Sequence, residues 1–360
     1  MSRFWSQLVH DLDPYVPGEQ PRREGIIKLN TNELPYGPSP NVFNAIQLAA
    51  SDSLRRYPDP QSRDLSQAIA TYHGVEIDQV FVGNGSDEVL AHGFAALFDR
   101  SKPILMPDIT YGFYEAYCRL FGLTSIRIPL DEAMQIVVDD YRRTSGGIVV
   151  ANPNAPTGIA LNLGEISELL SKNSHVPVII DEAYVDFGGE TAIPLIADWA
   201  NLLVVRTMSK SRGLAGLRIG YALGDRGLIE GLRRVKDSFN SYPLGSLAQA
   251  AGLASIKDEA YFAASCGQVI RDREWLQAGL KSLGFAVLPS SANFVFCRHT
   301  MRSAGALAEQ LRAAGIYIRH FDAPRVSDYL RITVGSQSEI DLLLDQLEQL
   351  VSHKVARAVD

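Results

Sequence analysis

Short apolar runs, most of them continuous, recur at intervals between residues 80 and 223. Seven stand out, and most are rich in β-branched residues: 80–82, 104–106, 126–128, 148–151, 176–180, 202–205 and 219–223. Runs that are apolar throughout, rather than alternating, are typical of strands buried on both faces of a sheet. Helical patterns separate several of them, for example at 87–98 and 163–171. This alternation predicts an α/β fold with a mainly parallel sheet of about seven strands.

The two ends of the chain follow other patterns. Residues 1–40 are rich in proline, asparagine and glycine, which predicts an irregular arm, and a helix is expected over 40–50. Long amphipathic helices are expected at 247–264 and 266–283. Shorter elements follow, with strands at 294–297, 317–319 and 330–333 and helices at 304–314 and 338–351. We therefore expect a large domain at 41–245 and a small α+β domain at 246–360. The arm, residues 1–40, is expected to join the small domain.

Composition and charge narrow the class of protein. The chain has 360 residues, of which 46% are apolar and 21% charged, so it is large enough for two domains and has no disordered composition. A net charge of −7 without any basic block argues against nucleic acids and anionic membranes as partners. We expect small-molecule partners or a second copy of the chain.

Neither the cysteines nor the histidines predict a metal site. Cys118, Cys266 and Cys297 lie far apart, which favours reduced thiols in a cytoplasmic protein over a disulfide framework or a zinc site. The seven histidines show no metal-ligand spacing, so no metal is expected. Residues 1–14 lack the apolar core of a signal peptide, and no apolar run approaches the roughly 20 residues that span a bilayer.

Ligands bind at the carboxyl ends of the strands in an open parallel sheet, so the residues after each run are candidate site residues. Gly83 to Glu88 follow the first run and open a helix. Glycines let the backbone approach an anion, and a helix N-terminus offers free N–H groups, so this segment is either a phosphate cradle or a plain tight turn. A dinucleotide-binding loop is a third interpretation, with Asp108 as the ribose-binding acid, although Glu88 replaces the third glycine of its motif.

Three charged residues lie at the ends of later runs. Asp181 directly follows 176–180, and a buried carboxylate there is either a helix cap or the counter-ion of a cationic ring nitrogen. Lys210 follows 202–205 and is either a surface charge or a desolvated amine suited to Schiff-base chemistry. Arg218 begins the next predicted strand, where an arginine is unusual.

One ligand accounts for these features together. It combines a phosphate, a cationic ring nitrogen, a phenolate oxygen and an aldehyde, and that combination is found in pyridoxal 5'-phosphate. The phosphate fits Ser86, Ser209 and Arg218, the ring nitrogen fits Asp181, the phenolate oxygen fits Tyr184 and the aldehyde fits Lys210.

The spacing of Asp181, Tyr184, Lys210 and Arg218 resembles that of the fold-type I, class II aminotransferases, which depend on pyridoxal phosphate. More narrowly, the chain resembles the histidinol-phosphate aminotransferase family over nearly its whole length. The segments that carry the resemblance are LNTNE at 29–33, RYPD at 56–59, GSDE at 85–88, TY at 110–111, PTG at 156–158, GLAGLR at 213–218, Arg319 and LRITVG at 330–335. The resemblance implies a fold-type I architecture, a large cofactor-binding domain with a smaller α+β domain, and a homodimer.

The resemblance also assigns roles to matching positions. Lys210 would hold the cofactor as a Schiff base and carry a proton, Asp181 would keep the ring nitrogen protonated, and Tyr184 would bond the ring 3-oxygen. The other cofactor-binding residues would be Gly85, Ser86, Asp87, Tyr111, which stacks on the ring, Thr207, Ser209, Arg218 and, from the second subunit, Tyr57. The substrate-binding residues would be Tyr15, Asn32, Arg319 and Arg331.

The implied activity is a step of histidine biosynthesis. It moves the amino group of L-glutamate to imidazole acetol phosphate and gives 2-oxoglutarate and L-histidinol phosphate. One position departs from the family pattern, because Ala155 stands where an asparagine usually precedes Pro-Thr-Gly and bonds the ring 3-oxygen. The alternatives are an aromatic aminotransferase or a phospho-amino-acid decarboxylase on the same scaffold, a nicotinamide-dependent oxidoreductase, and a non-catalytic cofactor-binding protein.

Overall fold

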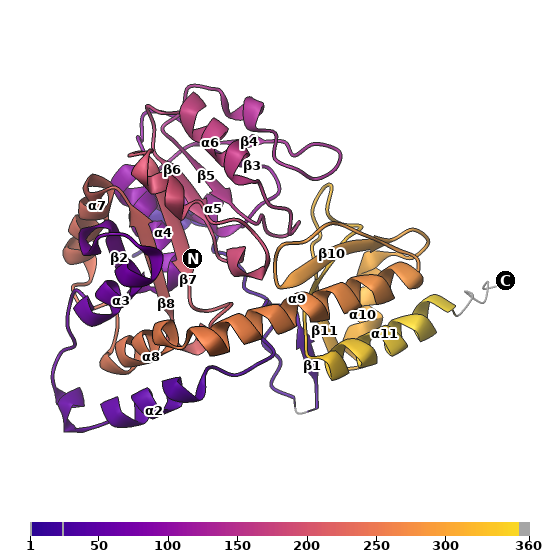
Figure 1. The fold of residues 1–360 in the computed structure, drawn as a ribbon. Coiled ribbons are helices and arrows are strands. Elements are labelled where there is room, and N and C mark those ends of the chain that lie inside the picture. The colour runs from indigo at the N-terminus through magenta and orange to yellow at the C-terminus, as the bar shows by residue number, and fades with distance from the viewer. Residues whose placement is uncertain (1, 24, 353–360) are drawn as a thin grey trace.

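A seven-stranded sheet lies at the centre of the larger part of the computed structural model, which describes residues 2–23 and 25–352 (Figure 1). Across the sheet, the strands are β2 (Val80–Asn84), β8 (Ile219–Gly224), β7 (Leu202–Thr207), β6 (Val178–Asp181), β5 (Gly147–Ala151), β3 (Ile104–Pro107) and β4 (Ser125–Ile128). Strand β8 is antiparallel to its neighbours β2 and β7, and the other neighbouring strands are parallel. The prediction of a mainly parallel seven-stranded sheet is confirmed, with one strand at each predicted run.

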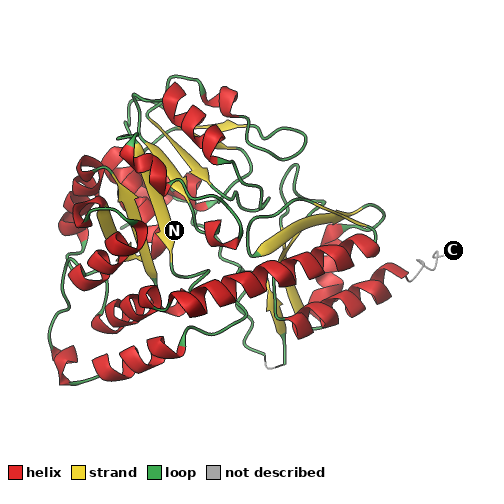
Figure 2. Ribbon diagram, in the orientation of Figure 1, coloured by secondary structure: helices red, strands yellow, loops and turns green. Residues whose placement is uncertain are grey.

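Helices cover both faces of this sheet (Figure 2). One face is covered by α4 (Gly85–Leu97), α5 (Phe113–Phe121) and α7 (Arg226–Phe239), and the other by α2 (Pro40–Ala49), α3 (Arg63–His73), α6 (Leu163–Lys172) and α8 (Ser246–Lys257). Within β6, Ile179 packs under the first group and Ile180 under the second, and both are fully buried. Because both faces are covered, most strand residues are apolar, although Arg206 lies inside β7 and the edge strand β4 contains the exposed Arg127. Short 3₁₀ helices occupy further connections: η1 (Asp52–Arg55), η2 (Ile77–Gln79), η3 (Val138–Tyr141), η4 (Val185–Phe187), η5 (Ile193–Ala197) and η6 (Ala215–Leu217).

The second sheet has five strands and includes residues from both ends of the chain. Its order is β1 (Ile27–Leu29), β11 (Ile316–His320), β12 (Leu330–Thr333), β10 (Phe294–His299) and β9 (Phe285–Val287). Helices α9 (Glu259–Ser282), α10 (Ala304–Ala313) and α11 (Gln337–Ser352) share its apolar core. Strand β1 pairs in parallel with β11, and this pairing fixes the residues that follow β1 beside the small domain.

Local predictions fail in three places. The arm is not irregular throughout, since α1 (Gln7–Asp11) and β1 lie within it. The break between the two long helices falls at Asp258 rather than near residue 265. The reason is a helix cap, because the Asp258 carboxylate accepts a hydrogen bond from the backbone N–H of Tyr261 (3.3 Å) and begins α9 there. Helices α3, α5 and α7 and strand β9 lie where the sequence predicted no element.

The division between the large and small domains at residues 245 and 246 stays a prediction. Helix α8 packs against α2 and α3, and its Ala251 and Ile256 lie in the core of the larger sheet. A division at Asp258, between α8 and α9, therefore agrees better with the packing.

Candidate active site

Strand ends bring the candidate residues to one edge of the larger sheet. Strands β2, β6 and β7 end at this edge, and the antiparallel β8 begins there. In the register of the sheet, Asn84 lies opposite Ile219, and Thr207 lies opposite Gly220. The loops after β2 and β7 therefore meet the residue that precedes β8, which is Arg218.

The loop between β2 and α4 is shaped to admit an anion beside Arg218. Gly85 begins α4 with φ +80°, and a side chain there would meet the Arg218 guanidinium at 2.5 Å. A side chain at Gly220 would lie 2.3 Å from the Gly85 backbone, so the close approach requires glycine at both positions. Arg218 donates to Asp87 (2.8 Å) and Ser209 (3.4 Å), and 45% of its side chain stays exposed. The free N–H groups of α4 and this guanidinium can receive a phosphate together.

Other cofactor-binding candidates surround this cradle. Ser86 lies in the first turn of α4 and is half-buried. Asp87 accepts a hydrogen bond from the Tyr111 hydroxyl (2.9 Å) as well as from the cradle arginine, so its carboxylate orients both side chains. Thr207 uses its hydroxyl oxygen to accept from the backbone N–H of Ser209 (3.1 Å). It therefore shapes the turn that presents the Ser209 hydroxyl to the cradle.

Asp181 ends β6 with a carboxylate that is almost fully buried. Asp181 is 4% exposed, and its carboxylate accepts hydrogen bonds from the Tyr114 hydroxyl (2.8 Å) and from the backbone N–H of Ala183 (3.2 Å). Burial raises the pKa of the Asp181 carboxyl to about 6, although these two donors oppose the shift. A cationic partner, such as a protonated ring nitrogen, would offset the free-energy cost of ionising the buried Asp181 carboxyl. Sequence reasoning missed Tyr114, because only the fold brings α5 under β6.

Lys210 and Tyr184 lie side by side at the junction with the small domain. The Lys210 ammonium is 5.7 Å from the centre of the Tyr184 ring and donates to the backbone carbonyl of Thr31 (3.2 Å). Asn32 donates from its amide to the Tyr184 hydroxyl oxygen (3.0 Å), and its amide oxygen accepts from the Thr333 hydroxyl (3.0 Å). Asn32 was expected to meet the substrate, and the structure shows each polar atom of its side chain in contact with one of these two residues.

Two arginines face each other across strands β11 and β12. Arg319 lies directly opposite Arg331 in the antiparallel register, where like charges destabilise a sheet. Arg331 donates to the carbonyl of Asn30 (2.9 Å), and its Nε–H is buried without a hydrogen-bond partner among the described residues. Burial lowers the pKa of Arg331. Burial likewise raises the pKa of Tyr15, while the charges of both arginines oppose that shift. This arrangement suits an anionic ligand.

Tyr57 is far more exposed than the other predicted site residues with exposed side chains, Tyr15 and Arg218. It is 82% exposed, and its ring stacks on Tyr242 with centroids 4.6 Å apart. Tyr15, by contrast, packs its ring against Phe113 (4.5 Å) and Tyr111 (6.0 Å), which places the arm over the candidate ring-stacking residue.

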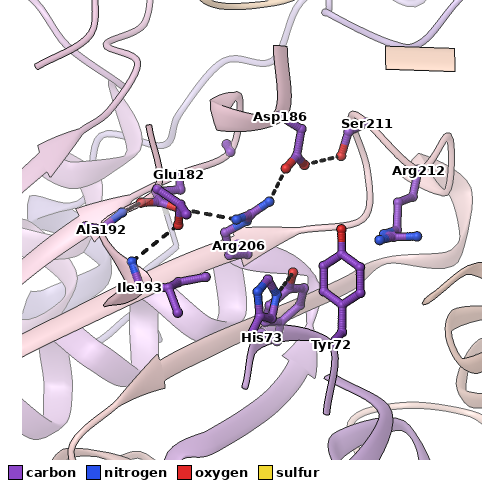
Figure 3. A network of polar contacts seen from close by, with 12 residues as sticks. Tyr72, His73, Glu182, Asp186, Ala192, Ile193, Arg206, Ser211 and Arg212 are labelled. Carbon is purple, nitrogen blue, oxygen red and sulfur yellow. Dashed lines mark hydrogen bonds and ion pairs between the residues drawn. The ribbon is translucent and has the colours of Figure 1, made fainter. Parts of the chain in front are cut away.

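Sequence reasoning also missed a buried charge network, shown in Figure 3. Arg206 donates to Glu182 (3.3 Å) and pairs with Asp186, which also accepts from the Ser211 hydroxyl (2.5 Å). Although burial opposes it, Arg206 lowers the pKa of Asp186. Glu182 and Ser211 directly follow the candidate ring-nitrogen partner and the candidate lysine, so the network ties those two segments together. An arginine inside the apolar strand β7 was the available signal.

The residues present fit pyridoxal phosphate on three observations. The cradle is open to an anion at Gly85 and Arg218, and the buried Asp181 requires a positive partner. The Lys210 amine contacts a neutral carbonyl, so no strong partner holds it away from an aldehyde. Within the part of the chain that the structure describes, no group of three or more metal-ligating side chains lies together.

Comparison with known proteins identifies the family. The family described as aminotransferase class I and II matches residues 24–347. The histidinol-phosphate aminotransferase of Gluconacetobacter diazotrophicus is 57% identical and covers 98% of this chain and 99% of that protein. Histidinol-phosphate aminotransferase 1 of Pseudomonas aeruginosa is 54% identical over 97% of this chain and 100% of that protein. The solved histidinol-phosphate aminotransferase of Sinorhizobium meliloti, in complex with pyridoxal-5'-phosphate, has a TM-score of 0.88 at 25% identity and covers 98% of both chains.

The chain therefore belongs to the class I and II aminotransferases, and it is a pyridoxal-phosphate-dependent transferase of fold type I. Its fold extends to distant members, since the aspartate aminotransferase of Thermus thermophilus superposes with a TM-score of 0.82 at 20% identity. Within this class, the chain is a member of the histidinol-phosphate aminotransferase family, which acts in histidine biosynthesis. The predictions of fold, cofactor and enzyme class are confirmed, and the nicotinamide-dependent and non-catalytic alternatives are set aside.

Proposed function

We propose that this chain transfers the amino group of L-glutamate to imidazole acetol phosphate and releases 2-oxoglutarate and L-histidinol phosphate. The observation that carries the substrate assignment is the cross-strand pair of Arg319 and Arg331. Two opposed guanidinium groups repel each other until an anion lies between them, and each can bind an anion through two parallel hydrogen bonds. Glutamate brings a carboxylate and the imidazole substrate brings a phosphate, so one arginine pair serves both half-reactions. Tyr15 would add its hydroxyl to the same subsite.

Each cofactor-binding residue would act on one part of the bound group. Pyridoxal phosphate, when bound, supplies an aldehyde that bonds amines and a ring that withdraws electrons. Lys210 would hold the aldehyde through Nζ and, once released, would carry a proton at the same atom. Asp181 would keep the ring nitrogen protonated, Tyr184 would donate to the ring 3-oxygen, and Tyr111 would stack on the ring. The phosphate would be held by Gly85, Ser86, Ser209 and Arg218, with Asp87 and Thr207 orienting them.

The active unit in this proposal is a homodimer. Tyr57 is 82% exposed, and its ring stacks on that of Tyr242. We assign its hydroxyl to the phosphate site of a second copy, so that each site is completed by its partner.

A cytoplasmic location belongs to the same proposal. The three cysteines are buried and free, as expected of thiols in a reducing compartment. No helix of the described residues combines the length and apolar character needed to cross a bilayer. Fractionation of cells that produce the protein at native level tests the location.

Half-reaction spectroscopy tests the proposed reaction. L-glutamate, added to the cofactor-loaded protein, should bleach the visible absorbance of the bound cofactor, and imidazole acetol phosphate should restore it. Phenylpyruvate serves as the matched acceptor, because it carries an aromatic ring and a carboxylate but no phosphate. Faster restoration by phenylpyruvate would favour an aromatic aminotransferase. Release of carbon dioxide from a phosphorylated amino acid would favour the decarboxylase.

A further inference from the structure

Ala155 removes one hydrogen-bond donor from the surroundings of Tyr184. It is 5% exposed and lies in an apolar cluster with Ala292 and Phe294, against the Tyr184 ring. Its methyl group cannot donate, so the 3-oxygen of the cofactor ring lacks the amide that the family pattern places there. Any replacement has to come from a neighbouring side chain or through Tyr184 itself.

Asn154, the nearest amide in sequence, cannot be that replacement. It is 1% exposed, and its side-chain oxygen accepts from the Thr110 hydroxyl (2.9 Å). Its amide nitrogen donates to the carbonyl of Ile109 (2.9 Å) and to the Thr157 hydroxyl oxygen (3.3 Å). Because an amide nitrogen has only two protons, both of its donors are used.

Asn32 reaches Tyr184 from the other side. It is 1% exposed, and its backbone N–H donates to the Thr333 hydroxyl oxygen (3.0 Å). That hydroxyl has a single proton, which it donates to the side-chain oxygen of Asn32 (3.0 Å). The orientation of the amide is therefore fixed, and its nitrogen donates to the Tyr184 hydroxyl oxygen (3.0 Å). Asn293 donates a hydrogen bond to the Asn32 carbonyl (3.1 Å) and not to the Asn32 side chain.

We propose that Asn32 is a positioning residue that makes Tyr184 the hydrogen-bond donor to the ring 3-oxygen, in compensation for Ala155. This inference rests on the proposed role of Tyr184. Because Asn32 donates to the hydroxyl oxygen, the Tyr184 proton stays free for another acceptor. A hydroxyl that accepts one hydrogen bond is also a stronger donor in the next, so the chain from Thr333 through Asn32 to Tyr184 acts cooperatively.

Asn32→Gly is the sharpest variant for a test. Asn32 has φ +56°, which glycine adopts without strain, so the change removes the amide and leaves the backbone geometry available. The readout is the pH midpoint at which the visible absorbance of the bound cofactor changes. A hydrogen bond to the ionised 3-oxygen lowers this midpoint, so Asn32→Gly should raise it by about one pH unit. The cofactor dissociation constant should rise about tenfold.

Two controls separate positioning from general destabilisation. Asn293→Ala removes a hydrogen bond to the Asn32 backbone, so it should lower the melting temperature and leave the absorbance midpoint unchanged. Thr333→Val removes the hydroxyl that orients the amide and should shift the midpoint in the same direction as Asn32→Gly, whereas Thr333→Ser should not. If Asn32→Gly does not fold, the comparison of Thr333→Val with Thr333→Ser tests the inference in its place.

Restoring the absorbance midpoint with a second substitution is the decisive experiment. Ala155→Asn restores the missing donor, so the double variant Asn32→Gly/Ala155→Asn should return the midpoint to within about 0.3 units of the parent. The inference is overturned if Asn32→Gly shifts the midpoint no more than Asn293→Ala, or if Ala155→Asn does not reverse the shift. If Tyr184→Phe also leaves the midpoint unchanged, the proposed role of Tyr184 fails first. That result is distinct from a failure of Asn32 alone.

Discussion

Asp181→Asn isolates the charge of one buried carboxylate from its shape. Asparagine has nearly the same size and can still accept the hydrogen bond from Tyr114, but it carries no charge. Asp181 is 4% exposed, so little water screens its interaction with a cationic ring nitrogen. The substitution therefore leaves the ring nitrogen without a counter-ion in a site that otherwise keeps its packing.

The expected loss follows from the burial of this pair. Removing one partner of a buried ion pair costs about 3–5 kcal/mol, which weakens binding roughly a hundredfold to a few thousandfold. Tyr114→Phe is the matched control, because it removes one hydrogen-bond donor from the same carboxylate but keeps its charge, and it costs about 1.5–3 kcal/mol. Cofactor-free protein is titrated with pyridoxal phosphate, and binding is followed by absorbance. If Asp181→Asn weakened binding no more than Tyr114→Phe, the ion-pair role would be refuted.

The same titration has a predicted pH dependence. Burial raises the pKa of Asp181 to about 6 in the cofactor-free fold, above its unfolded value. Stability from this group is therefore complete below the unfolded pKa of about 3.9 and is lost as the pH rises through about 6. A cationic ring requires the ionised form, so the parent should bind the cofactor more tightly as the pH rises from about 5 to about 7. Asp181→Asn should lack this increase, and an identical slope in both proteins would contradict the assignment.

Three further predictions concern the rest of the site. Arg331→Lys should raise the KM for both glutamate and the phosphorylated substrate without lowering the melting temperature. The reason is that lysine cannot bind an anion through two parallel hydrogen bonds. Unchanged KM values with a lower melting temperature would indicate that Arg331 has a structural role. Arg206→Met should lower the free energy of unfolding in urea by about 3–5 kcal/mol, because it leaves two carboxylates buried without their cationic partner. Ser211→Ala should lower it by only about 1 kcal/mol. Equal losses in the two variants would show that the charge network does not stabilise the fold. Mixing inactive Lys210→Ala with inactive Tyr57→Phe should restore part of the activity if sites are shared, and no recovery in proven mixed dimers would exclude sharing.

The sequence predicted the sheet well because its strands are buried on both faces. Six of the seven runs contain no charged residue, the run 126–128 at the sheet edge contains Arg127, and each of the seven became a strand. The sequence-based prediction was wrong about where α8 ends and α9 begins, because that boundary is set by one hydrogen bond to the Asp258 side chain. Pattern alone does not show which side chain of a long amphipathic stretch will cap a helix.

Residues at strand ends were predictable, and their long-range partners were not. Lys210, Asp181 and Arg218 stand where an open sheet binds ligands, so their positions made them candidates, and the family resemblance suggested a role for each of them. The hydrogen bond between Asn32 and Tyr184 joins residues 152 positions apart and depends on how the arm crosses the small domain. The contact of Tyr114 with Asp181 depends on the docking of α5, for which the sequence predicted no helix.

Chemical trapping of the cofactor tests the central claim most directly. Borohydride reduction of the cofactor-loaded protein converts a bond between the cofactor and an amine into a stable adduct, which proteolysis and mass spectrometry can locate. The account predicts the pyridoxyl phosphate mass on the peptide that contains Lys210, and its loss in Lys210→Ala. An adduct on any other lysine of the parent protein, or an equal yield from Lys210→Ala, would contradict it.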